Sequence, residues 1–128
     1  MHFGEHLMLD GYGGRQDLLD DKNLILSCLL ELPKLLGMKL LSEPTIYHAE
    51  DNNIKDPGGW TGVAVIAESH ISIHSFPKRG FVSADVYTCK NGMDTDLITN
   101  FFKQKFGLGN IETHFIKRGT KYPVQNIY

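Results

Sequence analysis

The stretch "TGVAVIAESHISIHSFPKRGFVSADVYTC", residues 61–89, decides the fold because it holds three strand-like segments in succession. The first, residues 61–68, is strongly apolar, and the third, residues 80–89, follows a short turn. The middle segment, residues 69–75, alternates between isoleucines and polar side chains, as a strand with one buried face does. Its polar face comprises His70, Ser72 and His74. Strands joined by short turns predict an antiparallel meander.

Strands and amphipathic helices are predicted on both sides of this meander. Alternation at the start of residues 5–14 predicts a strand that ends in a glycine turn. Three further segments are a helix over 20–37, a strand over 38–48 interrupted at Pro44, and a polar loop over 49–59. After the meander, a helix over 93–107 and a strand over 110–119 complete the chain. The expected class is α+β, a two-layer sandwich of a mostly antiparallel sheet with helices packed on one face.

Both predicted helices have recognisable ends. Asp20 or Asp21 is expected to cap the first and Gly37 to end it, while Asp94 or Thr95 caps the second and Gly107 ends it. Pro33 should kink or restart the first helix. The inner face expected for the first helix is Leu24, Cys28, Leu32 and Leu35, and for the second it is Leu97, Ile98, Phe101, Phe102 and Phe106.

Composition excludes several classes of protein. The 128 residues suit one domain, 1–128, and with 41% hydrophobic and 22% charged residues the chain can form a packed core. A net charge of −2 without a basic stripe argues against a nucleic-acid partner. The apolar run near residues 24–36 is too short and too interrupted to cross a membrane. No secretory signal is visible, and two cysteines do not indicate a disulfide framework, so a cytoplasmic setting is expected.

Glu68 and Ser69 are the first candidates for chemistry. A serine hydroxyl is a weak nucleophile without a nearby base, and His74 is the obvious base. However, their odd separation would put the two side chains on opposite faces of an uninterrupted strand. Either the chain bends near Ser69, or the two residues do not cooperate. The plain alternative is a turn serine beside a solvated strand face.

Other site types find weaker support. His70 and His74 share a face, but no third ligand and no HExxH or CxxC pattern accompanies them, so no metal is expected. No G-x-S-x-G elbow supports a Ser-His-acid hydrolase. Cys89 ends a predicted strand, where a thiol is either core or presented for function. Cys28, among the leucines of a helix, is expected in the core.

The strings "ESHISIH", "SFP" and "GFVSADVYTC" together resemble the S-adenosylmethionine decarboxylase family, in its small prokaryotic, pyruvoyl-dependent class. The flanking "GEHLMLDGYG" and "TGVAVIAE" are also similar to family strands. The resemblance covers nearly the whole chain. It is most specific over residues 61–89, where the serine, the histidine and the cysteine fall at the family's spacing.

The resemblance implies self-cleavage between residues 68 and 69. The Ser69 hydroxyl would attack the carbonyl of Glu68, and the resulting ester would break by β-elimination. Ser69 would become a covalent pyruvoyl group, the cofactor, at the start of a 69–128 α chain that accompanies a 1–68 β chain. His74 matches the histidine that assists processing. Thr61 stands where the family has a serine with the same task.

The resemblance also implies the roles of residues in the mature site. The pyruvoyl carbonyl would condense with the substrate amine as a Schiff base and withdraw electrons as carbon dioxide leaves. Cys89 matches the acid that then protonates the former α-carbon. Glu68, as a new chain end, and Asp10 would contact substrate. Candidates to stack on adenine are Tyr47 and Trp60.

Two positions depart from the family pattern. Lys78 stands where an acidic residue usually binds the ribose hydroxyls, and lysine cannot accept hydrogen bonds. Phe76 stands where tryptophan is common. The first expectation is decarboxylation of S-adenosylmethionine for spermidine synthesis; the alternatives are a smaller amino acid such as ornithine or arginine, or a non-catalytic homologue with a binding or regulatory role. The family's small members imply a homodimer with residues from both copies at each site.

Overall fold

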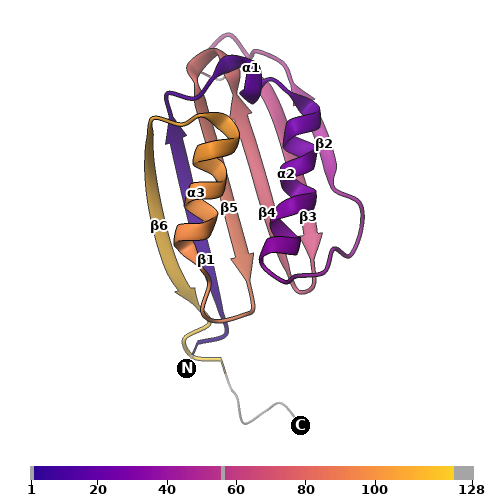
Figure 1. The fold of residues 1–128 in the computed structure, drawn as a ribbon, viewed down its shortest axis with the longest axis vertical. Helices are drawn as coiled ribbons and strands as arrows, with labels where there is room; N and C mark the ends of the chain where they lie inside the picture. Colours follow the sequence, from indigo (N-terminus) through magenta and orange to yellow (C-terminus); the bar gives the residue numbers. More distant parts are fainter. Residues whose placement is uncertain (1, 56, 123–128) are drawn as a thin grey trace.

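A computed structural model of the chain describes residues 2–55 and 57–122. Its strands form one antiparallel sheet in the order β2-β3-β4-β5-β1-β6 (Figure 1). The meander of β3, β4 and β5 is present as expected, whereas β1 lies between β5 and β6. The strands are β1 (Gly4–Tyr12), β2 (Thr45–Ala49), β3 (Gly59–Ile66), β4 (Ser69–Phe76), β5 (Phe81–Thr88) and β6 (Asn110–Arg118).

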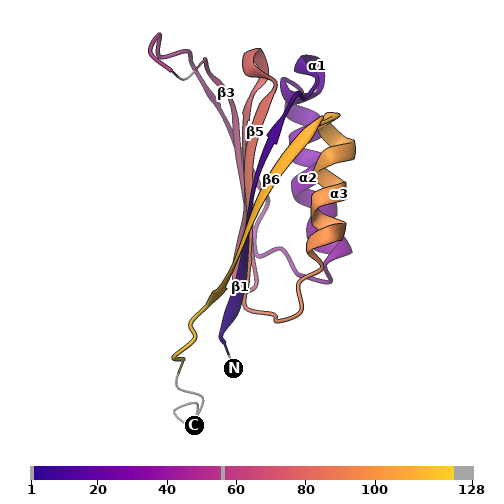
Figure 2. The ribbon, with the colours of Figure 1, turned by 90° about the vertical axis from the view of Figure 1, so that its left-hand side faces the viewer.

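The helices lie against one face of this sheet. They are α1 (Gln16–Leu19), α2 (Lys22–Leu35) and α3 (Thr95–Phe106), with a 3₁₀ turn, η1 (Pro77–Arg79), between β4 and β5. Figure 2 shows α2 and α3 side by side on that face, and none of the helices formed by residues 2–55 and 57–122 lies on the other face. The predicted α+β two-layer sandwich is therefore confirmed.

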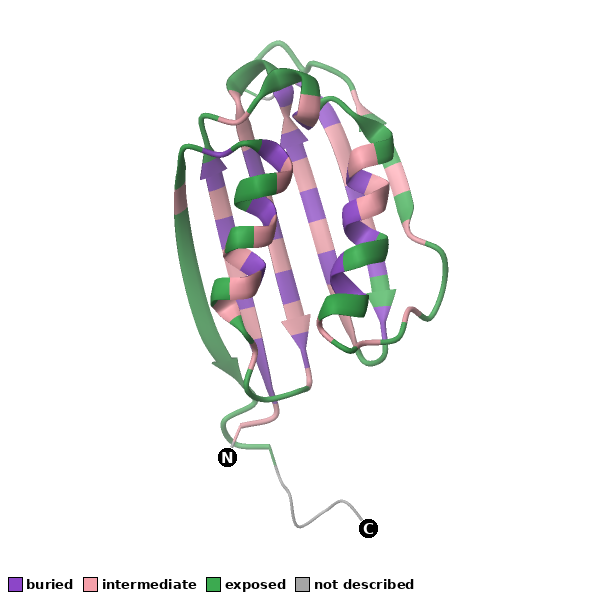
Figure 3. Cartoon of the chain, viewed as in Figure 1, coloured by how far each residue is buried: buried purple, intermediate pink, exposed green. Residues whose placement is uncertain are grey.

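Alternation along the strands separates a core face from an open face. Burial changes from residue to residue along the central strands (Figure 3). The core between sheet and helices includes Leu7, Leu9, Ile25, Leu29, Leu32, Ile71, Ile73, Val82, Val86, Ile98, Phe102 and Phe106. The opposite side, here called the open face, is formed by His6, Met8, Asp10, Thr61, Val63, Val65, His70, Ser72, His74, Phe76, Phe81, Ser83, Asp85 and Tyr87.

Helix ends follow the capping chemistry read from the sequence. The Asp21 carboxylate accepts hydrogen bonds from the backbone N–H groups of Asn23 and Leu24, at 3.0 and 3.1 Å. Asp94 does the same for α3 through the N–H of Leu97, at 3.0 Å. Gly37, with φ of +67°, follows α2 in the left-handed conformation that glycine adopts without steric cost.

Several details of the prediction were wrong. Residues 38–44 do not form a strand, because β2 begins only at Thr45. Within this segment, Leu40 forms an isolated β-bridge with Ile66. The four-residue helix α1 was not predicted. Helix α2 runs through Pro33, so of the two predicted effects of this proline, a kink or a restart, the restart does not occur. Its buried face is Ile25, Cys28, Leu29, Leu32 and Pro33, so Leu35, 55% exposed, lies outside it.

Candidate active site

A two-residue turn, Ala67 and Glu68, joins β3 to β4 and brings the Glu68–Ser69 peptide to an exposed tip. Ile66 pairs with Ser69 across the base of this turn. The end of β5 lies beside it, and the backbone N–H of Cys89 donates a hydrogen bond to the Ser69 hydroxyl oxygen at 3.1 Å. The hydroxyl is thus held while its own proton remains available to another acceptor.

Thr61 and His74 form a second pair on the open face. They lie directly opposite each other in the β3–β4 register, and Thr61 Oγ1 is 3.1 Å from His74 Nδ1. A hydroxyl that donates to Nδ1 leaves the Nε2 of the ring to face another group. This contact joins the two residues to which the sequence assigned help in processing.

Within one chain the two pairs lie at different ends of the sheet. Strand β4 runs without interruption from Ser69 to Phe76, so the bend after Ser69 that was one of the two open alternatives does not occur. Five residues of extended strand separate Ser69 and His74 by about 16 Å. In addition, Ser69 has the register of Ile71, which faces the helices, whereas His74 belongs to the open face. The structure of a single chain does not bring them together.

The candidate substrate-binding residues divide in the same way. Asp10 lies on the open face, where its carboxylate accepts a hydrogen bond from Ser83 at 3.0 Å. Tyr47 is opposite Thr61 and 64% exposed. Trp60 has the opposite register, and its indole N–H donates to the backbone and side-chain oxygens of Asp20, both at 3.1 Å. Trp60 therefore joins β3 to the turn between α1 and α2 and lies away from Asp10 and Tyr47.

The region of Lys78 contains groups that the sequence did not indicate. Lys78 itself is largely exposed, with its ammonium 3.8 Å from a carboxylate oxygen of Asp51. A pocket near this end of the sheet has aromatic and cationic walls. Its lining is Tyr12, Lys55, Pro57, Phe76, Arg79 and Phe81. Phe76 and Phe81 have ring centroids 5.4 Å apart, so the phenylalanine in the tryptophan position still contributes to an aromatic wall.

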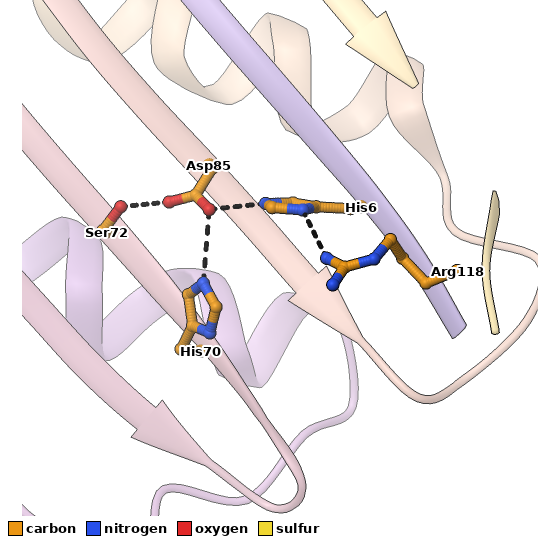
Figure 4. Close-up of polar contacts among 5 residues, drawn as sticks. All are labelled: His6, His70, Ser72, Asp85 and Arg118. Carbon is orange, nitrogen blue, oxygen red and sulfur yellow. Dashed lines mark hydrogen bonds and ion pairs between the residues drawn. The ribbon is translucent and has the colours of Figure 1, made fainter. Parts of the chain in front are cut away.

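A polar cluster on the open face was also missed (Figure 4). His6 Nε2 and His70 Nε2 lie 2.5 and 3.2 Å from one carboxylate oxygen of Asp85, and the hydroxyl of Ser72 donates to the other. Arg118 donates to the Nδ1 of His6 at 3.1 Å. We call these five residues the Asp85 cluster. The sequence signals were the polar face of residues 69–75, with His70 and Ser72, and a carboxylate in residues 80–89. His6 and Arg118 come from strands distant in the sequence.

Hydrogen bonding controls the charge of Asp85. Burial alone would raise the pKa of its carboxyl group, but the hydrogen bonds from Ser72, His6 and His70 outweigh burial and hold the pKa below its ordinary value. The group is therefore a carboxylate at neutral pH, and a carboxylate only accepts hydrogen bonds.

The two cysteines have different environments, as the sequence predicted for Cys28. Cys28 is buried among the apolar side chains of the core, and this burial raises the pKa of its thiol to about 12. Such a thiol stays protonated and inert. Cys89 is half-buried at the end of β5, beside Ser69. Both thiols are free.

Comparisons with known proteins agree with these features. A sequence profile of the family described as S-adenosylmethionine decarboxylase matches residues 5–119. The chain is 33% identical over 112 residues to an S-adenosylmethionine decarboxylase proenzyme of Pyrobaculum neutrophilum, covering 88% of this chain and 86% of the relative. An Acidithiobacillus ferrooxidans proenzyme of the same name is 28% identical over 116 residues, covering 91% and 82%.

A solved structure shows the same fold. The crystal structure of the adenosylmethionine decarboxylase from Aquifex aeolicus matches with a TM-score of 0.77 and 28% sequence identity, and the match covers 92% of each chain. Separately, within residues 2–55 and 57–122, no helix combines the length and the apolar character needed to span a membrane.

Proposed function

Because the chain belongs to the S-adenosylmethionine decarboxylase family, we propose that it is a self-processing decarboxylase of S-adenosylmethionine. The observation that supports this most strongly is the exposed Glu68–Ser69 bond, with the Ser69 hydroxyl held by the N–H of Cys89. Nucleophile, scissile carbonyl and a thiol thus belong to one end of the sheet.

Processing needs only groups of the chain and one water molecule. The Ser69 oxygen attacks the Glu68 carbonyl carbon, the bond from that carbon to the Ser69 nitrogen breaks, and the hydroxyl proton ends on the nitrogen. The Cα proton of Ser69 then leaves as its Cβ–O bond breaks, releasing residues 1–68 with Glu68 as a terminal carboxylate. The remaining enamine becomes an imine, and water replaces its nitrogen, which leaves as ammonia. The product is a pyruvoyl group at position 69.

The residues around position 69 suit this group. A pyruvoyl group supplies a carbonyl that binds a substrate amine and accepts the electron pair left when carbon dioxide departs. Cys89 is half-buried, and its backbone N–H contacts the Ser69 oxygen, so its thiol is the candidate acid for that position. Glu68 stays beside it as a new carboxyl end. Asp10 pairs with Ser83 at the His74 end of the sheet, so it would present its carboxylate to the cationic substrate from the partner copy.

A second copy of the chain would complete the site. The Thr61–His74 pair and the Ser69–Cys89 pair occupy opposite ends of the same sheet, and no helix in the described part of the chain covers the open face. Its apolar members, such as Val65 at 46% exposed, gain burial if two open faces stack. A two-fold axis perpendicular to the strands sets the hairpin end of one copy over the His74 end of the other. We therefore propose a homodimer with two shared sites.

The two departures from the family pattern, Lys78 and Phe76, bear on which substrate the protein binds. S-adenosylmethionine remains first, because the aromatic rings of Tyr12, Phe76 and Phe81 offer flat surfaces on which a base can stack. The competing substrate class is a smaller amino acid such as ornithine or arginine, favoured by Lys78, which cannot bind ribose hydroxyls as a carboxylate does. The ion pair with Asp51 draws the lysine charge away from either cationic substrate.

Intact mass and labelled substrates test the proposal. The purified wild-type protein should give two chains, 1–68 and 69–128, and the Ser69→Ala variant a single chain of 128 residues. Release of labelled carbon dioxide from S-adenosylmethionine, but not from ornithine or arginine, then identifies the substrate. A folded wild-type chain that stays whole would refute the enzymatic proposal and favour a binding or regulatory homologue.

Complementation tests the shared site. Separately tagged Ser69→Ala and His74→Ala chains should each remain uncut when produced alone. Produced together, the His74→Ala chain should be cut, because its own Ser69 would meet His74 of the partner copy. Failure of the mixed pair to cut, with both chains present in one dimer, would contradict the shared arrangement.

We also propose that the protein works in the cytoplasm. Its two free cysteines include one in a fully buried position, and neither needs an oxidising compartment.

A further inference from the structure

The Asp85 cluster connects four strands of the open face. His6 comes from β1, His70 and Ser72 from β4, Asp85 from β5 and Arg118 from β6. Figure 4 shows the side chains of His6, His70 and Ser72 at the Asp85 carboxylate, with Arg118 behind them in contact with His6. The His70 ring also packs near Tyr87, with centroids 5.6 Å apart, and edge-on to His6 at 5.9 Å. His70 is thus held from two sides.

The hydrogen bonds fix where the protons are. Arg118 can only donate, so the Nδ1 of His6 must accept, and the Nε2 of His6 therefore carries a proton that it donates to Asp85. His70 donates to the same oxygen through its own Nε2. His6 Nε2, His70 Nε2 and Asp85 Oδ2 lie within 4.8 Å of one another, a spacing that a cation can also use. A cation would need a free lone pair on the Nε2 of His6. Because Nδ1 accepts the hydrogen bond from Arg118, Nε2 carries the ring proton and has no free lone pair. The arrangement is a hydrogen-bonded chain.

The position of His70 connects these hydrogen bonds to the cleavage site. His70 directly follows Ser69, so it shares a peptide bond with the residue whose hydroxyl attacks Glu68. Strand β5 and the residue that follows it contact both His70 and Ser69. Asp85 binds the His70 ring, and the N–H of Cys89 donates to the Ser69 hydroxyl oxygen. An intramolecular attack depends on the reacting atoms being held close together, and a displacement of about 1 Å can cost roughly 10²-fold in rate.

We propose that Asp85, supported by His6 and Arg118, is a positioning residue for self-cleavage: it fixes His70 and thereby sets the Ser69 hydroxyl against the Glu68 carbonyl. This inference rests on the proposed self-cleavage at residues 68 and 69. After cleavage the same contact holds the new amino end of the 69–128 chain in place.

Time courses of cleavage test this role. The Asp85→Asn variant keeps the shape of the side chain. However, its amide nitrogen donates hydrogen bonds, so it cannot accept those that Ser72 or the two histidines donate to the carboxylate. We expect its 69–128 fragment to appear roughly 10- to 100-fold more slowly than that of wild type. The matched control is Glu112→Gln, which neutralises a carboxylate on the same side of the sheet that binds Tyr12. It should be cut at the wild-type rate.

Further variants separate positioning from stability. Val86→Ala removes buried volume next to Asp85 on the other side of β5 and should lower the melting temperature without slowing cleavage of the folded protein. His70→Gln retains an N–H donor near the Nε2 position and should be cut faster than His70→Leu. Hydroxylamine, which cleaves esters, should release less fragment from Asp85→Asn than from wild type during the first minutes.

The outcomes distinguish the possibilities. If wild type and Asp85→Asn are cleaved equally fast, the positioning role is overturned and the proposed function stays intact. Equal slowing by the destabilised Val86→Ala variant would overturn it too, since the loss of cleavage rate would then follow the loss of stability. Cleavage of wild type that stops with a chelator and returns with Zn²⁺ would make the cluster a metal site instead. Wild type that never cuts refutes the proposed function itself.

Discussion

Glu5 shows how a single residue combines burial with charge. Its side chain lies on the helix side of β1, only 5% of the residue is exposed, and it accepts hydrogen bonds from the N–H of Met93 at 2.8 Å and from His2 at 2.9 Å. Burial alone would raise the pKa of Glu5, but the hydrogen bonds from Met93, His2 and Gly92 outweigh it and lower the pKa below its ordinary value of 4.5.

This shift predicts an acid-dependent loss of stability. A lowered pKa in the folded protein adds stability above the unfolded value, and the gain is lost as the pH falls through the folded value. Glu5→Gln should therefore lower the free energy of unfolding by about 1–3 kcal/mol at pH 7, and the gap should narrow below pH 4.5. Urea unfolding at pH 7 and at acidic pH measures it. An equally large gap at both would contradict the assignment.

At the same scale, residue pairs were predictable only where sequence spacing is short. Thr61 and His74 lie on neighbouring strands of one hairpin, so alternation alone puts them on one face. His6 and Asp85 are 79 residues apart, and no local pattern states that β1 lies next to β5. The Asp85 cluster could not have been found without the strand order.

At the scale of elements, prediction succeeded where capping and alternation act locally. The caps at Asp21 and Asp94 and the glycines at helix ends marked α2 and α3 well. The prediction failed for residues 38–44, whose leucines are typical of a strand. Most of this segment has no partner strand in the sheet. Tertiary pairing overrides local β propensity in such cases.

Two neighbouring phenylalanines of α3 allow a matched test of its inner face. Phe102 is fully buried, whereas Phe101 is only partly buried against the same core. Phe102→Ala should lower the free energy of unfolding by about 3–5 kcal/mol. Phe101→Ala should cost clearly less, because its ring already contacts water. Chemical denaturation of both variants decides the point, and equal losses would show that the two rings are equally engaged.

At the scale of the whole molecule, the sequence predicted the two layers but not how the strands are ordered. Strand β1 begins the chain yet lies between β5 and β6, which come from its second half. The site follows the same logic: alternation placed His74 on the open face, but only the unbroken length of β4 shows that Ser69 lies at the far end.

This order predicts how cut protein behaves. Residues 1–68 contain β1, β2 and β3, and residues 69–128 contain β4, β5 and β6. The two fragments should therefore elute together in gel filtration under native conditions and separate only in denaturant. Fragments that part without denaturant would show that the β1 pairing with β5 and β6 is weak.

The insertion of β1 between β5 and β6 also concerns the history of each molecule. In the single-chain precursor, the first strand meets its neighbours by an intramolecular search, at the high effective concentration of a tethered segment. Once the proposed cleavage has cut this tether, the same search becomes a bimolecular encounter between two incomplete peptides with exposed strand edges, which aggregate readily. Native structure in the mature enzyme is then preserved by the rate at which it unfolds, and a molecule that unfolds after maturation is lost to the cell.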